Sequence, residues 1–317
     1  MTEIFRAVLL AVLLCHVALR VALLLRQTRF VAARRDAVPA IFAERIPLAA
    51  HRRAADYTLA KIRLEYAALC VEILYFLALT WGGGLQALHD FWSARLTHPQ
   101  TYGVSLIASV VILSCLLDIP LNLYRQFRLE ARFGFNRMTL ALFFSDLLKQ
   151  IPLFVLLGLP LLAAVLWLMQ AAGEYWWLYA CLAWTAFNAL MFFVYPLWIA
   201  PLFNRFTPLA DGEVKTRTQS LLRRSDFGGR ELGLFVMDGS RRSSHGNAYF
   251  TGFGKARRIV FFDTLLERLT PRQVEAVLAH ELGHLHHRHI IRRVALLFVF
   301  SLGFFALLGQ LLVAPWF

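Results

Sequence analysis

One short stretch of the 317-residue chain carries the side chains with the clearest chemistry, His280-Glu281-Leu282-Gly283-His284. In an α-helix, residues four apart return to nearly the same face about 6 Å further along the axis. Both imidazoles can therefore reach one zinc ion, while Glu281 can accept a proton from a water molecule that such an ion activates. The His-Glu-x-x-His spacing is typical of zinc metalloproteases.

The same stretch has a plain structural alternative, a solvated helix rich in histidine. Half of the ten histidines lie between His280 and His289, which raises the chance of an accidental match. The surroundings favour the metal site. Thr270-Pro271 is a typical helix start, and Gln273 stands where a capping box requires it. The motif is therefore expected within a helix that begins at about residue 271.

A segment of mixed helix and strand character precedes this helix. Val214–Phe227 has the pattern of an amphipathic helix that stops at Gly228-Gly229. Leu232–Asp238 and Arg258–Phe262 are short apolar runs rich in strand-forming residues. Serine, glycine and asparagine between the two runs predict turns or an irregular edge.

The composition excludes an ordinary soluble protein. Hydrophobic residues make up 59% of the chain and charged residues only 17%, and the mean hydropathy is +0.57. Apolar runs long enough for a helix to cross a bilayer number about six. They are Ile4–Leu25, Tyr66–Leu85, Val104–Leu121, Ile151–Met169, Trp177–Leu197 and Val294–Val313.

The distribution of basic residues predicts how the chain crosses the membrane. The net charge is +13, which in a soluble protein would suggest nucleic acid. Here the basic residues fall between the apolar runs, with nine in 26–65, one in 86–103, five in 122–150, none in 170–176 and sixteen in 198–293. By the positive-inside rule the basic segments are cytoplasmic, and no nucleic-acid partner is expected. Segments 26–65 and 198–293 could also hold anionic lipid, although topology alone accounts for most of their charge.

These observations predict a mainly α, polytopic membrane protein with a small cytoplasmic α/β unit that resembles the zincin metallopeptidases. We expect a multi-span membrane domain over residues 1–200 and a metallopeptidase domain over 201–293. A further span over 294–317 would leave that domain incomplete.

Several stretches together resemble the integral-membrane CAAX prenyl protease family of zinc metallopeptidases, in its bacterial form. They follow one another in the family's order between about residues 130 and 290, and His289 lies just beyond the last. The stretches are Phe133–Thr139, Ile199–Leu209, Asn247–Gly252, Arg258–Thr264 and Ala279–His284.

The resemblance implies a membrane-embedded endopeptidase whose helices enclose a water-filled chamber that the zinc faces. It implies zinc ligation by His280 and His284, with Glu281 as the catalytic base. Asn247, Ala248 and Tyr249 would form an edge strand along which a substrate peptide is held, although an ordinary turn into a strand would look the same. His245 is a possible transition-state donor and His289 a possible further site residue.

The chain departs from the family at the third zinc ligand, which in relatives is a glutamate on a later helix. No Asp or Glu follows Glu281 in this sequence. Three explanations are open: a truncated sequence, a protein that has lost activity, and another residue in place of the ligand. His287 is the nearest substitute, but it lies about 10 Å along the helix axis from His280. We expect the missing ligand beyond Phe317.

Three functions remain open. The first is a zinc endopeptidase acting on CAAX-type, misfolded or tail-exposed polypeptides in a bacterial inner membrane, with its catalytic region in the cytoplasm. The second is a catalytically inactive membrane scaffold that binds peptides or serves quality control. The third, a metal transporter or sensor, is disfavoured because no ligands within the spans lead to the histidines. The expected partners are a polypeptide substrate and the lipid bilayer, and the expected cofactor is zinc.

Overall fold

Helices dominate the structure, a computed structural model that describes residues 3–225, 233–251, 258–287 and 289–315. The longest are α1 (Glu3–Ala33), α2 (Leu48–Thr80), α4 (Pro99–Tyr124), α6 (Leu140–Leu153), α7 (Leu159–Ala171), α8 (Trp176–Val194) and α13 (His289–Leu312). Short helical turns extend several of them: η2 (Arg125–Glu130), α5 (Ala131–Phe133), η3 (Phe154–Gly158), η5 (Tyr195–Ile199) and α9 (Ala200–Phe203). The mainly α architecture with a small α/β unit is confirmed.

Among the residues that the structure describes, five helical segments are long and apolar enough to cross a membrane by themselves. The second predicted span, Tyr66–Leu85, does not end as expected. It belongs to a pair, α2 and α3 (Gly84–Ser93), that bends by 52° and passes the same test only when the two are taken together. The break between them is Trp81-Gly82-Gly83, and Gly83 has a φ of 76°, which non-glycine residues rarely adopt. The prediction of about six spans thus corresponds to five, or to six if the bent pair is one span.

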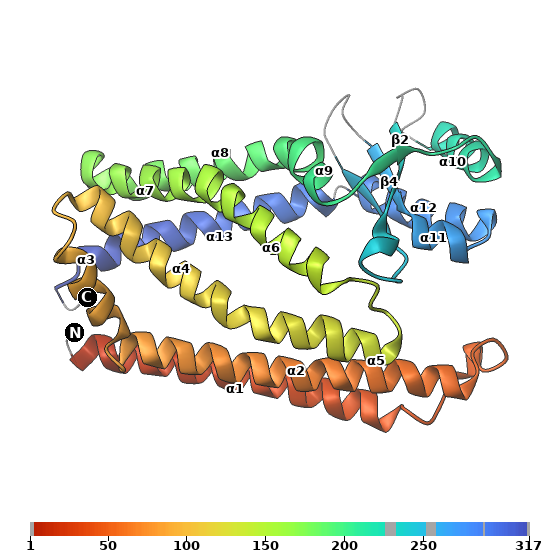
Figure 1. Cartoon of the computed structure of the whole chain (residues 1–317), viewed down its shortest axis with the longest axis horizontal. Helices are drawn as coiled ribbons and strands as arrows, with labels where there is room; N and C mark the ends of the chain where they lie inside the picture. The colour runs from red at the N-terminus through yellow and green to blue at the C-terminus, as the bar shows by residue number, and fades with distance from the viewer. Residues whose placement is uncertain (1–2, 226–232, 252–257, 288, 316–317) are drawn as a thin grey trace. The chain divides into compact units, whose positions relative to one another are not determined.

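The chain divides into two compact units, the first of which comprises Met1–Gly134 with Leu311–Phe317. Within it α1 and α2 lie side by side (Figure 1). A bidentate ion pair joins the residues just after α1 to the first turns of α2: the Arg35 guanidinium donates to both carboxylate oxygens of Asp56, at 2.7 and 3.0 Å. At the other end of α2, Tyr75 donates a hydrogen bond of 2.5 Å to the carbonyl of Val110 in α4.

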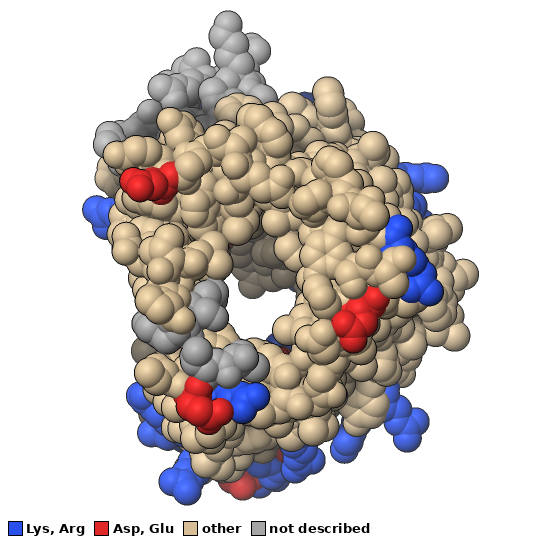
Figure 2. All heavy atoms as spheres, turned by 90° about the vertical axis from the view of Figure 1, so that its left-hand side faces the viewer, with Lys and Arg blue, Asp and Glu red and all other residues tan. Residues whose placement is uncertain are grey.

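The second unit, Phe135–Gln310, contains the remaining apolar helices and a small sheet. Its helices α7 and α8 are neighbours joined by the turn η4 (Gly173–Tyr175). The surface that includes this turn shows few Lys, Arg, Asp or Glu side chains (Figure 2). This matches the absence of basic residues from segment 170–176.

The described part of the second unit contains a sheet of four strands in the order β1-β2-β4-β3. These are β1 (Phe206–Pro208), β2 (Gly233–Met237), β3 (Ala248–Thr251) and β4 (Arg258–Phe262). The two central strands β2 and β4 are parallel, and each outer strand is antiparallel to its neighbour. Both central strands were predicted from their apolar runs, although Leu232 lies outside the described residues. The strand β3 is an edge, so its outer backbone groups have no strand partner within the described sheet.

Helix α12 (Pro271–His286) packs against β3 of this sheet, and α10 (Glu213–Arg224) packs against α12. Their shared core includes four fully buried side chains, Ile259 and Phe261 of β4 with Val274 and Leu278 of α12. The predicted capping box starts α12. The Thr270 amide donates to Gln273 Oε1 at 2.9 Å, and the Gln273 amide donates to Thr270 Oγ1 at 3.4 Å. A short helix, α11 (Asp263–Arg268), links β4 to α12.

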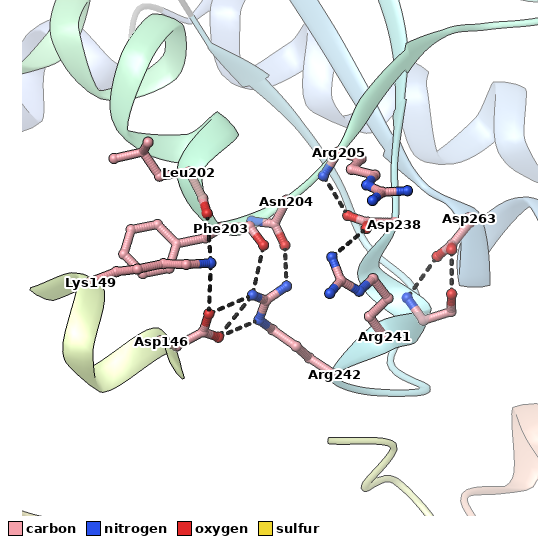
Figure 3. A network of polar contacts seen from close by, with 11 residues as sticks. Asp146, Lys149, Leu202, Phe203, Asn204, Arg205, Asp238, Arg241, Arg242 and Asp263 are labelled. Atoms are coloured by element: carbon pink, nitrogen blue, oxygen red, sulfur yellow. Dashed lines mark hydrogen bonds and ion pairs between the residues drawn. The ribbon is translucent and has the colours of Figure 1, made fainter. Parts of the chain in front are cut away.

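A largely buried ion pair links helix α6 to the loop before β3 (Figure 3). Arg242 donates to both carboxylate oxygens of Asp146, at 2.8 to 3.0 Å. The same guanidinium donates to the Phe203 carbonyl at 2.6 Å and to Asn204 Oδ1 at 2.7 Å. The side chains of Asp146 and Arg242 are only 11% and 20% exposed. A single guanidinium thus fixes three chain segments that are far apart in the sequence.

We predict that Arg242→Met destabilises the protein strongly, by about 3–5 kcal/mol, because it leaves the Asp146 carboxylate buried without its main partner. The double variant Arg242→Met/Asp146→Leu should regain most of this loss, since no buried charge remains. Unfolding of the detergent-purified chain by denaturant measures both. A double variant as unstable as the single one would contradict this account of the ion pair.

Candidate active site

Helix α12 carries His280 and His284 one turn apart in its carboxyl-terminal half, and Glu281 directly follows His280. The Nε2 atoms of the two histidines lie 3.1 Å apart. Two imidazole nitrogens bound to one tetrahedral zinc at about 2.0–2.1 Å stand about 3.3 Å apart. Both histidines are exposed and Glu281 is half-buried, so all three side chains are accessible to a reactant. The donor pair therefore has the chemistry and nearly the spacing that zinc requires.

The second ring nitrogen of His284 faces another histidine. His284 Nδ1 and His289 Nδ1 lie 2.8 Å apart, so one of them donates a hydrogen bond to the other. A contact of this kind fixes the ring orientation of a metal-binding histidine and leaves the opposite nitrogen, here Nε2, for the ion. His289 thus lies against the side of the His284 ring that faces away from His280.

A third ligand is not brought to this pair by the part of the chain that the structure describes. No group of three His, Cys, Asp or Glu side chains there could hold a metal ion. The ring of His287, the nearest substitute in the sequence, stacks on that of His289, with the ring centroids 5.6 Å apart. The described residues therefore bring together two imidazole nitrogens with the spacing of zinc ligands and no third candidate ligand.

Asn247, Ala248 and Tyr249 lie at the start of the edge strand β3, which packs against α12. The Asn247 carbonyl accepts from the Phe262 amide of β4 at 2.9 Å. Because strand backbone groups alternate in direction, those of Tyr249 also face β4, whereas those of Ala248 and Phe250 face the open edge. Asn247 Oδ1 accepts from the Ala248 amide at 2.9 Å, which satisfies one of these edge groups.

The side chain of Tyr249 is held in a protonated state. Burial, with Tyr195 nearby, raises the pKa of Tyr249 to about 12. Its hydroxyl lies 3.9 Å from the sulfur of Met237 on strand β2. The phenol is therefore a neutral side chain at physiological pH and can act as a hydrogen-bond donor.

His245, the possible transition-state donor, lies in the loop just before β3. Its exposed ring stacks on Phe135, with the ring centroids 4.2 Å apart. The backbone of the same loop is tied to Phe135, because the Ser244 amide donates to the Phe135 carbonyl at 3.0 Å. The His245 carbonyl accepts from the buried hydroxyl of Thr264 at 2.8 Å.

The residues that hold this loop were not identified from the sequence. Besides Arg242, Asp238 accepts from the Arg205 amide at 2.7 Å, and Asp263 accepts from the Ser240 amide at 2.9 Å (Figure 3). The Arg137 amide donates to the Arg242 carbonyl at 3.1 Å. One signal was visible in advance, because Asp146 is a carboxylate within an apolar helix, where such groups need a partner.

Two family models match the chain. The model described as CAAX prenyl protease N-terminal, five membrane helices, covers residues 27–205. The model described as peptidase family M48 covers residues 208–315. The two models meet at strand β1 (Phe206–Pro208).

Among curated proteins, the chain is similar to CAAX prenyl protease 1 homologues. It is 36% identical over 249 residues to the one from Oryza sativa, which covers 75% of this chain and 58% of that protein. It is 41% identical over 187 residues to the one from Arabidopsis thaliana, which covers 59% of this chain and 44% of that protein. It is also 37% identical to CAAX prenyl protease 1 of Saccharomyces cerevisiae over 68% of this chain and 48% of the yeast protein.

A solved structure agrees with these matches. The crystal structure of S. mikatae Ste24p superposes with a TM-score of 0.86 and 29% identity, over 95% of this chain and 71% of that one. The chain thus spans about half the length of the curated relatives that it matches. The resemblance seen in the sequence motifs is confirmed, and the chain belongs to the CAAX prenyl protease family of M48 peptidases.

Proposed function

We propose that the protein is a zinc-dependent, membrane-embedded endopeptidase that hydrolyses peptide bonds of membrane-associated polypeptides. The observation that carries this proposal is the pair of Nε2 atoms 3.1 Å apart on α12, with Glu281 between the two histidines in sequence. The same helix packs against β3, the strand whose outer edge can take a peptide. Metal ligands, a base and a peptide-binding edge thus belong to one packed unit.

In this proposal His280 and His284 hold the zinc ion through their Nε2 atoms. When bound, zinc lowers the pKa of water and polarises a carbonyl group. Glu281 accepts a proton from the attacking water and transfers it to the leaving amine, which is the role its half-buried position beside the histidines allows. His289 keeps the His284 ring oriented through the 2.8 Å contact between their Nδ1 atoms.

The substrate would lie extended along β3 as an added strand. Main-chain hydrogen bonds to the Ala248 carbonyl and to the outward N–H and carbonyl of Phe250 would hold any sequence, since the Ala248 amide is already bonded to Asn247 Oδ1. Asn247 and Tyr249 would flank these groups. His245 could donate to the developing negative charge, but its ring must leave the stacked position on Phe135 to do so. In the stacked position His245 would instead line the loop beside which the peptide enters β3.

The names of the curated relatives suggest CAAX-type substrates, and misfolded or tail-exposed membrane polypeptides fit the same edge. The count of basic residues favours a cytoplasmic position for the metallopeptidase domain, which we assign to residues 201–293. A bacterial inner membrane remains our proposal for the location, although the relatives named above are eukaryotic.

One observation favours a second function, a catalytically inactive scaffold that binds peptides. Only two ligands converge within the described residues, whereas a catalytic zinc site has three protein ligands. A scaffold would bind extended peptides at β3 without zinc and without turnover. Zinc dependence of cleavage therefore separates the two functions.

Glu281→Gln should abolish peptide cleavage while zinc stays bound, because the variant keeps both histidines and loses only the base. Removal of a general base lowers the rate by about 10²–10⁴-fold. The measurement pairs peptide turnover with elemental analysis of zinc on the same preparation. Full turnover in Glu281→Gln would contradict the protease mechanism. Peptide binding by zinc-free wild type without turnover would favour the scaffold.

The edge strand is tested by Phe250→Pro, which removes one outward N–H, and by Phe250→Ala, which loses the same aromatic ring but keeps that N–H. A neutral hydrogen bond contributes about 0.5–1.5 kcal/mol, so Phe250→Pro should raise KM for a long peptide by about 2–12-fold beyond Phe250→Ala. Equal KM values for the two variants would show that the peptide does not bind along β3.

A further inference from the structure

A cavity in the first unit lies apart from the histidine site in the sequence. Its volume is about 890 Å³, and helices α2 and α4 with the turns η2 and α5 supply its walls. Three of its lining residues are arginines, and the rest are apolar apart from one tyrosine. The lining residues are Ala60, Arg63, Leu64, Ala67, Pro120, Leu121, Tyr124, Phe127, Arg128, Leu129, Ala131, Arg132 and Phe133.

None of the described residues that line this cavity carries a carboxylate. Arg63 and Arg128 make no ion pair with any residue that the structure describes, and both are exposed. The nearby carboxylates are engaged elsewhere. Glu130 accepts from the Tyr57 hydroxyl at 2.7 Å, and Glu65 lies 3.7 Å from Arg125. Arg35 and, as a smaller effect, the nearby Arg132 lower the pKa of the Asp56 carboxyl. The cavity therefore gathers three positive charges, and two of them, Arg63 and Arg128, have no ion-pair partner among the described residues.

The walls of the cavity are held in place without a ligand. Arg53 of α2 donates to the Phe133 carbonyl of α5 at 2.8 Å. The hydrogen bond between Tyr57 and Glu130 joins α2 to η2 in the same way. The six-residue π-helical turn η2, which carries Arg128, therefore keeps a fixed position against α2.

The hydropathy of α2 and α4 places the cavity at the boundary of the apolar region. The apolar run of α4 is Val104–Leu121, and the three arginines at 125, 128 and 132 follow it. The apolar run of α2 starts at Tyr66, just after Arg63. Because an apolar run of about 20 residues spans the hydrocarbon core, the arginines lie where lipid headgroups begin.

We propose that this cavity binds the phosphate headgroup of an anionic phospholipid. Three guanidinium groups match a phosphate, for which arginine supplies paired donors. The apolar walls suit the first segments of the acyl chains, and a free phosphate ion would gain nothing from them. Basic pockets between membrane helices are a known setting for anionic headgroups. The proposal does not depend on the protease function.

The test compares binding of phosphatidylglycerol and phosphatidylcholine with equal acyl chains to the detergent-purified full chain, by native mass spectrometry. Wild type should bind phosphatidylglycerol more tightly. Each basic residue near an anionic lipid contributes about a fivefold factor, so Arg63→Gln/Arg128→Gln should weaken phosphatidylglycerol binding by about 25-fold and leave phosphatidylcholine unchanged.

The matched control is Arg34→Gln/Arg45→Gln, which removes the same charge from residues of this unit that do not line the cavity. It should bind phosphatidylglycerol within about twofold of wild type. Equal loss in both double variants would overturn the site, because only overall charge would then matter. Displacement of the lipid by inorganic phosphate at the same concentration would overturn the lipid as occupant. If the glutamine pair fails to fold, Arg63→Lys/Arg128→Lys keeps the charge and should weaken binding less than tenfold.

Discussion

The buried charge pair of Arg242 and Asp146 is the interaction on which the proposed site depends. A carboxylate within an apolar helix is stable only when it is paired, and Arg242 both neutralises Asp146 and satisfies the Phe203 carbonyl and Asn204. Arg242 lies in the loop that leads to β3. The need to pair the Asp146 carboxylate of α6 therefore fixes the position of the loop from which the edge strand starts. The Arg242–Asp146 pair thus both stabilises α6 and positions the edge strand that would bind the peptide.

The histidine pair is positioned by a different and more local set of interactions. The capping box at Thr270 and Gln273 fixes the start of α12. Burial of Val274 and Leu278 in the core that they share with β4 fixes which face of the helix points inward. With the helix start and buried face set, His280 and His284 must lie on the outer side of the helix. The 3.1 Å separation of their Nε2 atoms follows from the i, i+4 spacing and from the contact of His284 with His289.

Much of the fold could be predicted because it rests on local patterns. Apolar runs marked the long helices, and the residues at 270–273 marked the start of α12 within one position. The predicted end of the second span, Leu85, was wrong. The sequence stays apolar up to Leu85, whereas helix α2 ends at Thr80 and the backbone turns at Gly82 and Gly83. The role of Arg242 could not be predicted, since its partners lie 96, 39 and 38 residues away and no sequence period links them.

The most direct test of the central claim is the zinc content of the detergent-purified chain, measured by elemental analysis for wild type, His284→Ala and His287→Ala. The account predicts about one zinc per chain in wild type and in His287→Ala, and almost none in His284→Ala, because only the last removes one of the paired Nε2 atoms. Zinc that persists in His284→Ala, or a folded wild type without zinc, would contradict the assignment of the metal to this pair.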